Sequence, residues 1–133
     1  MRRVTVESPY AGDVDKNVKY AQECLKDSLR RGEAPLASHL LYTQVLDDTI
    51  PEERTWGINA GFEWLEQAEA CILYIDNGIS NGMRFARAFA QDRGIPVEYR
   101  LLYTSLYPPK PSRNDLYAFG HDLGTRLMKG TCL

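Results

Sequence analysis

The chain has 133 residues, which suits a single compact domain, and its 16 Lys and Arg residues against 18 Asp and Glu give a formal net charge of −2. That balance lacks the basic excess of nucleic-acid-binding modules, so we expect no nucleic-acid partner. Hydrophobic residues make up 44%, yet no apolar stretch is long enough to cross a bilayer, and residues 1–10 lack the apolar segment of a secretory signal, so we expect a cytoplasmic protein without a membrane partner.

The first half of the chain predicts strands and helices in alternation. Residues 3–7 alternate and end at a Ser-Pro breaker, as a strand does. A helix follows over 13–32, capped by Asp13, with inward positions at Val14, Val18, Ala21, Leu25 and Leu29. Residues 34–38 predict a second strand and residues 39–48 either a loop or a short helix. Pro51 then opens a helix that runs to about residue 67.

The second half continues the alternation. Residues 71–75 form a continuous apolar run, typical of a central strand covered on both faces. Ser80 caps a helix up to Gly94 with Phe85, Ala88 and Phe89 inward, and residues 96–102 return as a strand. A Pro-rich bridge at 107–111 leads to a last helix over about 114–129. This order predicts an α/β fold, a parallel sheet with helices on both faces.

Ligands of such sheets bind beyond the carboxyl ends of the strands, so the loops 7–13, 38–48 and 76–82 should converge. The first loop leads into a helix N-terminus, which favours an anion such as phosphate, although a tight turn that requires Gly12 explains it equally well. The third loop offers a second helix end at Ser80, with close backbone approach at Gly82. Two helix ends facing one crevice would suit a nucleotide.

Other residues have side chains that could bind or react, but their sequence patterns are less specific for a function. His39 follows the second strand, where it donates to a ligand, serves as an acid, or is partly buried and bonds to the backbone. The cysteines are odd in number and lack metal-ligand spacing, which predicts free thiols and no metal site: Cys24, Cys71 and Cys132. Trp56 and Trp64 are core or interface aromatics. We expect no cofactor.

Five segments, in their order along residues 3 to about 100, resemble the nucleoside 2-deoxyribosyltransferase superfamily, including its nucleoside 5′-monophosphate N-glycosidases. They are Glu7-Ser-Pro-Tyr-Ala-Gly12, Leu36-Ala-Ser-His-Leu40, Phe62-Glu-Trp-Leu-Glu-Gln-Ala68, Cys71 to Ile75, and Gly82-Met-Arg-Phe-Ala86. The chain also resembles small bacteriophage proteins that share the Ser-Pro-Tyr-Ala-Gly opening. The resemblance implies a flavodoxin-like, Rossmann-like three-layer fold, one domain over 1–133 with a helical extension from about 107, and a homo-oligomer. Trp56 and the Tyr-rich residues 99–107 offer aromatic surface suited to such self-association.

The chain departs from the resembled enzymes at their chemical centre. There the Gly-Met pair is followed by a Glu that attacks the sugar and holds it as a glycosyl ester, whereas here the matching residue is Arg84. A guanidinium has only donors and cannot form that ester. The Asp before the Trp of the enzymes' second helix is also missing, with Gly61 the nearest match. In the first turn of its helix Arg84 opposes the helix dipole, so either an anionic ligand compensates this unfavourable position or the side chain points to solvent.

Three functions follow as hypotheses. The first is a binder of a nucleoside phosphate or nucleotide derivative, with Arg84 on the phosphate and Tyr10 against the base; in a phage it would sequester a nucleotide signal in the host cytoplasm. Its pocket would be lined by Ser8, Tyr10, Gly12, Ser38, His39, Ser80, Gly82 and Arg84. The alternative is an active N-glycosidase or deoxyribosyltransferase in which Glu7 or Asp76 is catalytic. The third is a protein–protein adaptor with an exposed apolar patch.

Overall fold

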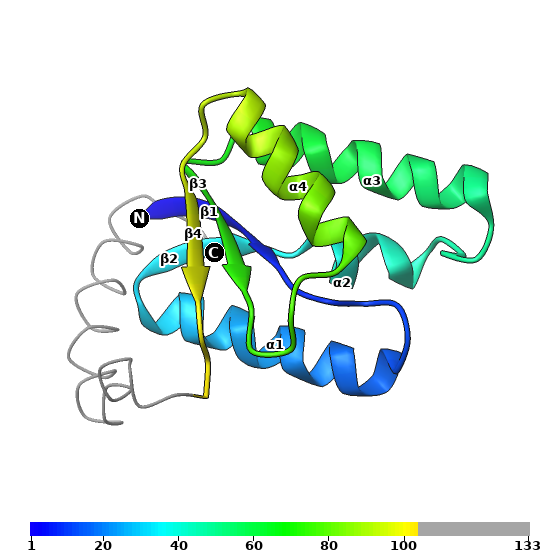
Figure 1. Cartoon of the computed structure of the whole chain (residues 1–133), viewed down its shortest axis with the longest axis horizontal. Helices are drawn as coiled ribbons and strands as arrows, with labels where there is room; N and C mark the ends of the chain where they lie inside the picture. Colours follow the sequence, from blue (N-terminus) through cyan, green and yellow to red (C-terminus); the bar gives the residue numbers. More distant parts are fainter. Residues whose placement is uncertain (104–133) are drawn as a thin grey trace, which may run out of the picture.

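The computed structural model describes residues 1–103 and forms three layers, with a parallel sheet between α1 and the pair α3 and α4 (Figure 1). The elements are β1 (Arg2–Glu7), α1 (Val14–Arg30), β2 (Glu33–Leu36), α2 (Ser38–Leu41), the 3-10 helix η1 (Tyr42–Gln44), α3 (Pro51–Glu66), β3 (Ala70–Tyr74), α4 (Asn81–Asp92) and β4 (Val97–Arg100). The predicted α/β class is confirmed. The predicted bridge at 107–111, the last helix, the helical extension and Cys132 lie outside the described residues.

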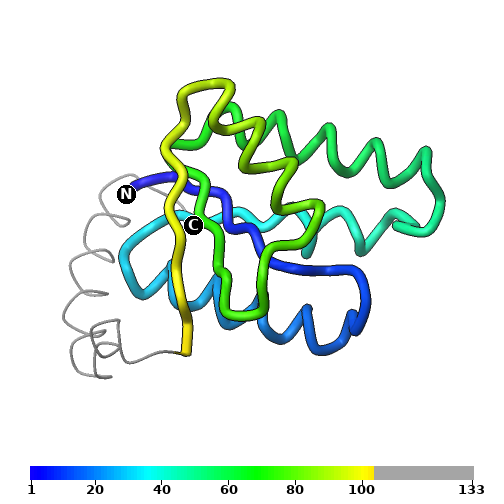
Figure 2. Tube along the Cα trace, in the orientation of Figure 1, coloured from blue at the N-terminus to red at the C-terminus, as the bar shows by residue number. Residues whose placement is uncertain are grey.

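The sheet has the strand order β2-β1-β3-β4, and every pairing is parallel. The tube in Figure 2 shows β1 beside β3 with the crossover helices leaving from their ends. All five residues of β3 are buried, as the apolar run predicted for a central strand. Pro35 lies in β2, at the edge of the described sheet. A proline is tolerated there because its missing N–H donor can face away from the neighbouring strand, so no hydrogen bond between strands is lost.

One core cluster lies between α1 and the sheet. It joins Val4 and Val6 of β1 and Ile72 of β3 to Tyr20 and Cys24 of α1. Asp13 caps α1 as predicted, since its side chain accepts a hydrogen bond from the Lys16 N–H. The predicted inward stripe of α1 is wrong except at its middle, because Val14 and Leu29 are exposed while the buried residues are Tyr20, Ala21, Cys24, Asp27 and Ser28.

The second cluster lies between the other face of the sheet and the helices α3 and α4. Cys71 and Leu73 of β3 pack there with Leu65 of α3 and with the buried residues of α4, Met83, Ala86 and Ala90. The rings of Phe62 and Phe89 stack with centroids 4.5 Å apart and join the two helices. The predicted inward positions of α4 are therefore shifted, because Phe85 and Ala88 are exposed and only Phe89 is partly buried.

The segment after β2 turns at once into short helices. The predicted second strand ends two residues early, at Leu36, and Ser38 begins α2 instead. Of the two readings of residues 39–48, the short helix is observed, as α2 and η1. Trp56 and Trp64 are each 54% exposed, so neither is a core residue.

A buried polar network crosses the α1 side of the sheet. Arg100 of β4 is 5% exposed and holds Glu33 of β2 through two hydrogen bonds of 2.7 and 2.8 Å. Burial alone would raise the pKa of Glu33, but hydrogen bonds from Arg100, Arg2 and Ser28 lower it to about 2. Every buried charge in this network therefore has a partner.

Candidate functional site

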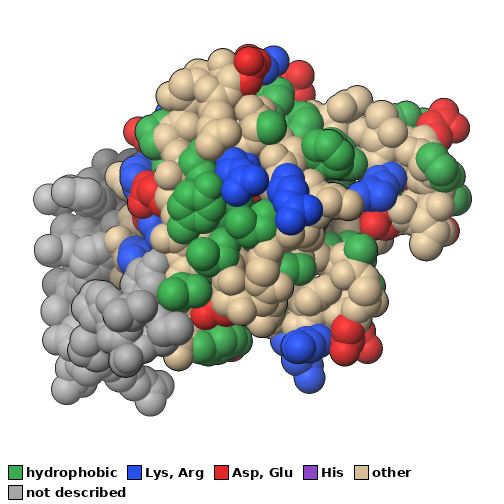
Figure 3. Space-filling model, in the orientation of Figure 1, with side chains coloured by type: hydrophobic (Ala, Val, Ile, Leu, Met, Phe, Trp, Pro, Cys, Tyr) green, Lys and Arg blue, Asp and Glu red, His purple; other side chains and the backbone are tan. Residues whose placement is uncertain are grey.

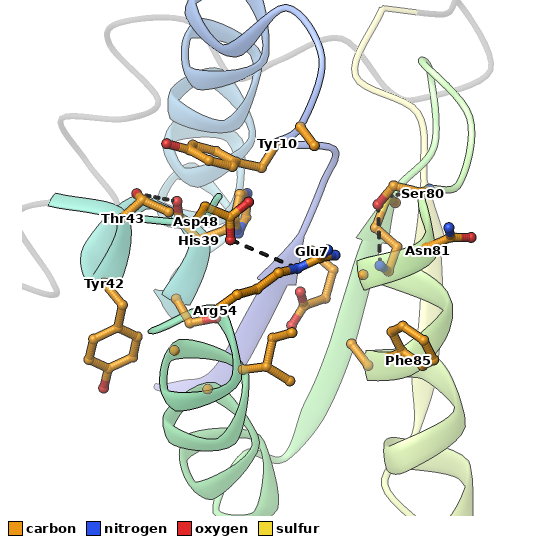
Figure 4. Close-up of a pocket in the computed structure, with 18 of the residues that line it drawn as sticks. Glu7, Tyr10, His39, Tyr42, Thr43, Asp48, Arg54, Ser80, Asn81 and Phe85 are labelled. Carbon is orange, nitrogen blue, oxygen red and sulfur yellow. Dashed lines mark hydrogen bonds and ion pairs between the residues drawn. The ribbon is translucent and has the colours of Figure 1, made fainter. Parts of the chain in front are cut away.

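A cavity of about 460 Å³ opens where the ends of β1 and β2 meet the helices α3 and α4 (Figure 4). This size is ordinary for a small-molecule site. Its wall combines polar residues with apolar ones from five segments: Glu7, Ser8, Tyr10, Ala11, Ser38, His39, Tyr42, Thr43, Leu46, Asp48, Glu53, Arg54, Gly57, Ile58, Gly61, Phe62, Ser80, Asn81, Gly82, Met83, Phe85 and Ala86.

Most of the residues predicted for the site do meet at this cavity, which forms where the three predicted loops converge. Those that line it are Glu7, Ser8, Tyr10, Ser38, His39, Ser80 and Gly82. Gly12, Asp76 and Arg84 are not among the lining residues. The N-terminus of α1, which was expected to face the crevice, does not line it either, so of the two predicted helix ends the cavity has that of α4.

Asp76 is engaged in holding the chain together. Its carboxylate accepts a hydrogen bond of 2.5 Å from the Tyr20 hydroxyl and further bonds from the backbone N–H groups of Leu102 and Tyr103. Burial opposes ionisation of Asp76, but these hydrogen bonds lower its pKa below the usual range. The carboxylate is therefore ionised and its lone pairs are directed at the backbone after β4.

Arg84 and Gly12 lie near the cavity without lining it. Arg84 is exposed, and its Nη1 donates to Asn81 Oδ1 at 3.2 Å. Gly12 has a φ of +104°, a conformation that side chains rarely adopt, so the turn into α1 requires glycine there. The turn itself is tied to α1, because Asn17 Nδ2 donates to the carbonyl groups of Tyr10 and Ala11.

Glu7 supplies the carboxyl group of the cavity floor (Figure 4). It is the last residue of β1, and it shares with Thr5 the face of the strand that points toward α3 and α4. Burial raises the pKa of Glu7 to about 8. At neutral pH the group is therefore mostly a protonated carboxylic acid, which both donates and accepts hydrogen bonds.

Ser8 and His39 form a pair beside Glu7, with Ser8 Oγ 2.7 Å from His39 Nε2. Burial lowers the pKa of His39 to about 4, so the imidazole is neutral at pH 7. The buried Nδ1 of His39 has no hydrogen-bond partner among residues 1–103. Because a buried N–H without an acceptor is costly, we assign the ring proton to Nε2, which then donates to Ser8 Oγ. The hydroxyl hydrogen of Ser8 is thereby left for an acceptor in the cavity.

The first turn of α4 forms the opposite wall. Ser80 is its N-cap, as predicted, and Ser80 Oγ accepts a hydrogen bond from the Met83 N–H at 3.3 Å. The first N–H groups of any helix have no partner within the helix, so those of Asn81 and Gly82 stay available. A Cβ built on Gly82 would meet only Ser80 Oγ, at 3.9 Å, so the space over this turn is open.

The largest group of lining residues that the sequence did not reveal comes from α3 and the loop before it. Arg54 extends from α3 across the cavity, where its Nε lies 3.9 Å from Asp48 Oδ1 (Figure 4). The spacing of Gly57 and Gly61, four residues apart on one helix face, was the available signal. At Gly61 a Cβ would lie 2.7 Å from Ser38 Oγ, so α3 approaches the start of α2 as closely as glycine allows.

A family model described as "Domain of unknown function (DUF7768)" matches residues 2–100. The chain belongs to the DUF7768 family. A search of curated proteins found no match to this DUF7768 chain.

Among solved structures, the DUF7768 chain is similar to a 2-deoxyribosyltransferase from the psychrotolerant bacterium Bacillus psychrosaccharolyticus. The TM-score is 0.62 at 15% identity, over 80% of this chain and 77% of that one. The similarity shows that the two proteins share a fold. It agrees with the deoxyribosyltransferase-like, flavodoxin-like fold that the resemblance implied, while the match leaves the phage resemblance untested.

Two further findings concern residues 1–103 of this family member. No helix among them is long and apolar enough to span a membrane. Nor does this part of the chain hold a group of three or more His, Cys, Asp or Glu residues suited to a metal ion.

Proposed function

We propose that the cavity binds a nucleoside phosphate or nucleotide derivative. The observation that carries the proposal is the placement of the cavity, which lies beyond the carboxyl ends of parallel strands in a fold shared with a 2-deoxyribosyltransferase. The chemistry of the wall supports it. Tyr10 and Phe62 offer apolar surface for a base, and Ser8 and Glu7 offer hydrogen-bond donors to its acceptors.

We propose binding without covalent catalysis as the primary function. Arg84, which stands where the resembled enzymes carry their nucleophile, lies outside the cavity and cannot form a glycosyl ester. Gly61, the nearest match to the missing Asp, has no room for a side chain against Ser38. Sequestration of a nucleotide signal and self-association through exposed aromatic residues belong to the same proposal, and both stay predictions.

Cleavage of an N-glycosidic bond is the second candidate, and Glu7 favours it. A carboxylic acid that stays protonated at neutral pH is the group that would donate a proton to a departing base. This route would need water as the nucleophile, since the nucleophilic Glu of the resembled enzymes is replaced by Arg84 here. Release of free base from a nucleotide by the wild type but not by Glu7→Gln would support this candidate.

Thermal unfolding across a panel of nucleosides and nucleotides tests the primary proposal. A ligand that binds only the folded protein adds about 2.7 kcal/mol of stability at 100 times its dissociation constant, which for this size raises the melting temperature by several degrees. We expect stabilisation by at least one nucleotide and no release of base, as checked by chromatography. If every compound in the panel leaves the melting temperature unchanged at millimolar concentration, the proposal is wrong.

A further inference from the structure

The cavity contains one arginine, Arg54, and the described residues leave most of its hydrogen-bonding capacity unused. Its closest charged neighbour is Asp48, 3.9 Å away through Nε, which is too long for a hydrogen bond. Both side chains are partly exposed, 48% for Arg54 and 37% for Asp48, and exposed ion pairs of this kind contribute little to stability. Asp48 is therefore easily displaced from Arg54 by another anion.

The surroundings of Arg54 also suit an anion. Figure 4 shows the side chain crossing the cavity above Glu7, toward the wall that carries Ser80 and Asn81. Glu7 is mostly uncharged at neutral pH because of its burial, so the floor does not repel an anion. The first turn of α4 adds the positive end of the helix dipole on the opposite side, with open space over Gly82.

Resting on the proposed function, we propose that Arg54, rather than Arg84, binds the phosphate of the ligand and makes the site prefer a nucleotide to its nucleoside. The guanidinium of Arg54 can present two parallel N–H groups to two phosphate oxygens, a geometry that arginine forms more readily than lysine. The base and sugar then lie between Arg54 and the segment Ser8 to Tyr10. Asp48 acts as a stand-in for the phosphate when the cavity is empty and moves aside when the ligand enters.

Isothermal titration with matched ligands tests this assignment. The probes are the nucleoside that stabilises the protein most in the panel and its 5′-monophosphate, with inorganic phosphate as a third ligand. For Arg54→Gln we expect the affinity for the monophosphate to fall by about 10- to 100-fold, the range of a lost charge-assisted hydrogen bond, with the nucleoside affected less than threefold. For Asp48→Asn we expect tighter binding of the monophosphate, because the competing carboxylate is gone.

Two variants serve as controls. Arg3→Gln removes an exposed arginine that lies, like Arg54, 3.9 Å from a carboxylate, but at the far end of β1. Arg84→Gln removes the arginine of the sequence-based hypothesis, which lies outside the cavity. We expect neither to change the preference for the monophosphate. Binding of inorganic phosphate alone that depends on Arg54 would show that the anion subsite works without the base.

The possible failures are distinct. If nucleoside and monophosphate bind equally well in both the wild type and Arg54→Gln, the phosphate role of Arg54 is overturned while the proposed function stands. If Arg84→Gln rather than Arg54→Gln removes the preference, the assignment reverts to Arg84. If no nucleoside or nucleotide binds, the proposed function and this inference fail together.

Discussion

Burial moves the pKa values of Glu7 and His39 in opposite directions and leaves both side chains neutral at pH 7. The pKa of Glu7 rises to about 8 and that of His39 falls to about 4. For each residue the low-polarity surroundings favour the uncharged form, which is protonated for a carboxyl and deprotonated for an imidazole. The floor of the cavity is therefore polar and mostly uncharged at pH 7.

Substitution Glu7→Gln should flatten the dependence of stability on pH. Because the folded pKa of Glu7 lies above its unfolded value near 4.5, its contribution is fully present below pH 4.5 and is lost as the pH rises through 8. Between pH 5 and pH 8 the wild type should therefore lose about 3 kcal/mol more stability than Glu7→Gln. Urea unfolding of both proteins across this range measures the difference. Parallel curves would mean that Glu7 is ionised in the folded protein.

The contact between α3 and α2 depends on the missing side chain at Gly61. In Gly61→Ala, the new Cβ would lie 2.7 Å from Ser38 Oγ and 3.1 Å from Ser38 Cβ, so the Ser38 hydroxyl must rotate away and its Cβ must shift by a few tenths of an ångström. We expect a loss of about 1–3 kcal/mol, the usual cost of overpacking, measured by denaturant unfolding.

Gly57→Ala is the matched control on the same helix, four residues earlier. There the nearest atom to a new Cβ is Leu46 Cδ1 at 3.4 Å, an ordinary contact. Because alanine favours a helix more than glycine does, this variant should be neutral or stabilising. Equal effects of the two substitutions would show that helix propensity, not the approach to Ser38, governs Gly61.

At the scale of helices and strands, the sequence predicted the features that depend on neighbouring residues. It failed to predict those that depend on partners far along the chain. Asp13 and Ser80 were predicted as caps because a cap acts within four residues. The buried face of α1 was misplaced because Asp27 is polar, and one of the two partners that make its burial acceptable, the Tyr74 hydroxyl, lies 47 residues away, beside the local partner Arg31. Asp76 was expected in the site for the same reason, since its partners at Leu102 and Tyr103 are not visible in its own loop.

The residues that line the cavity at the strand ends were among those the sequence named, whereas those along α3 were not. Glu7, Ser8 and His39 follow strands, and the edge where parallel strands end is a general property of the fold. Arg54 lies in the early part of a helix next to two acidic residues, a pattern that a solvated helix start also produces. Its direction depends on how α3 crosses the sheet, which no local pattern specifies.

At the scale of the molecule, the exposed surface of residues 1–103 carries hydrophobic and charged side chains together. Figure 3 shows hydrophobic and basic side chains interspersed on the face over α4 and β4. The large exposed hydrophobic residues there include Phe85, Tyr99 and Tyr103, while Trp56 and Trp64 lie on α3. This distribution leaves aromatic surface on more than one element for the self-association that the sequence predicts.

The ion pair between Arg100 and Glu33 has a consequence for how the molecule opens. These residues belong to β4 and β2, the two outer strands of the described sheet, which in most proteins fray independently of the centre. Here detachment of β4 takes Arg100 from Glu33, which keeps Arg2 and Ser28, and detachment of β2 leaves Arg100 with Glu98 and Tyr74. Either opening therefore weakens a buried charge network that spans the sheet. Native-state hydrogen exchange should therefore report one cooperative unit, with the amides of β2 and β4 exchanging at the same free energy as those of β3. In Arg100→Met the two edges should separate into units of lower protection, and edge amides that already exchange faster in the wild type would show that the bridge does not couple them.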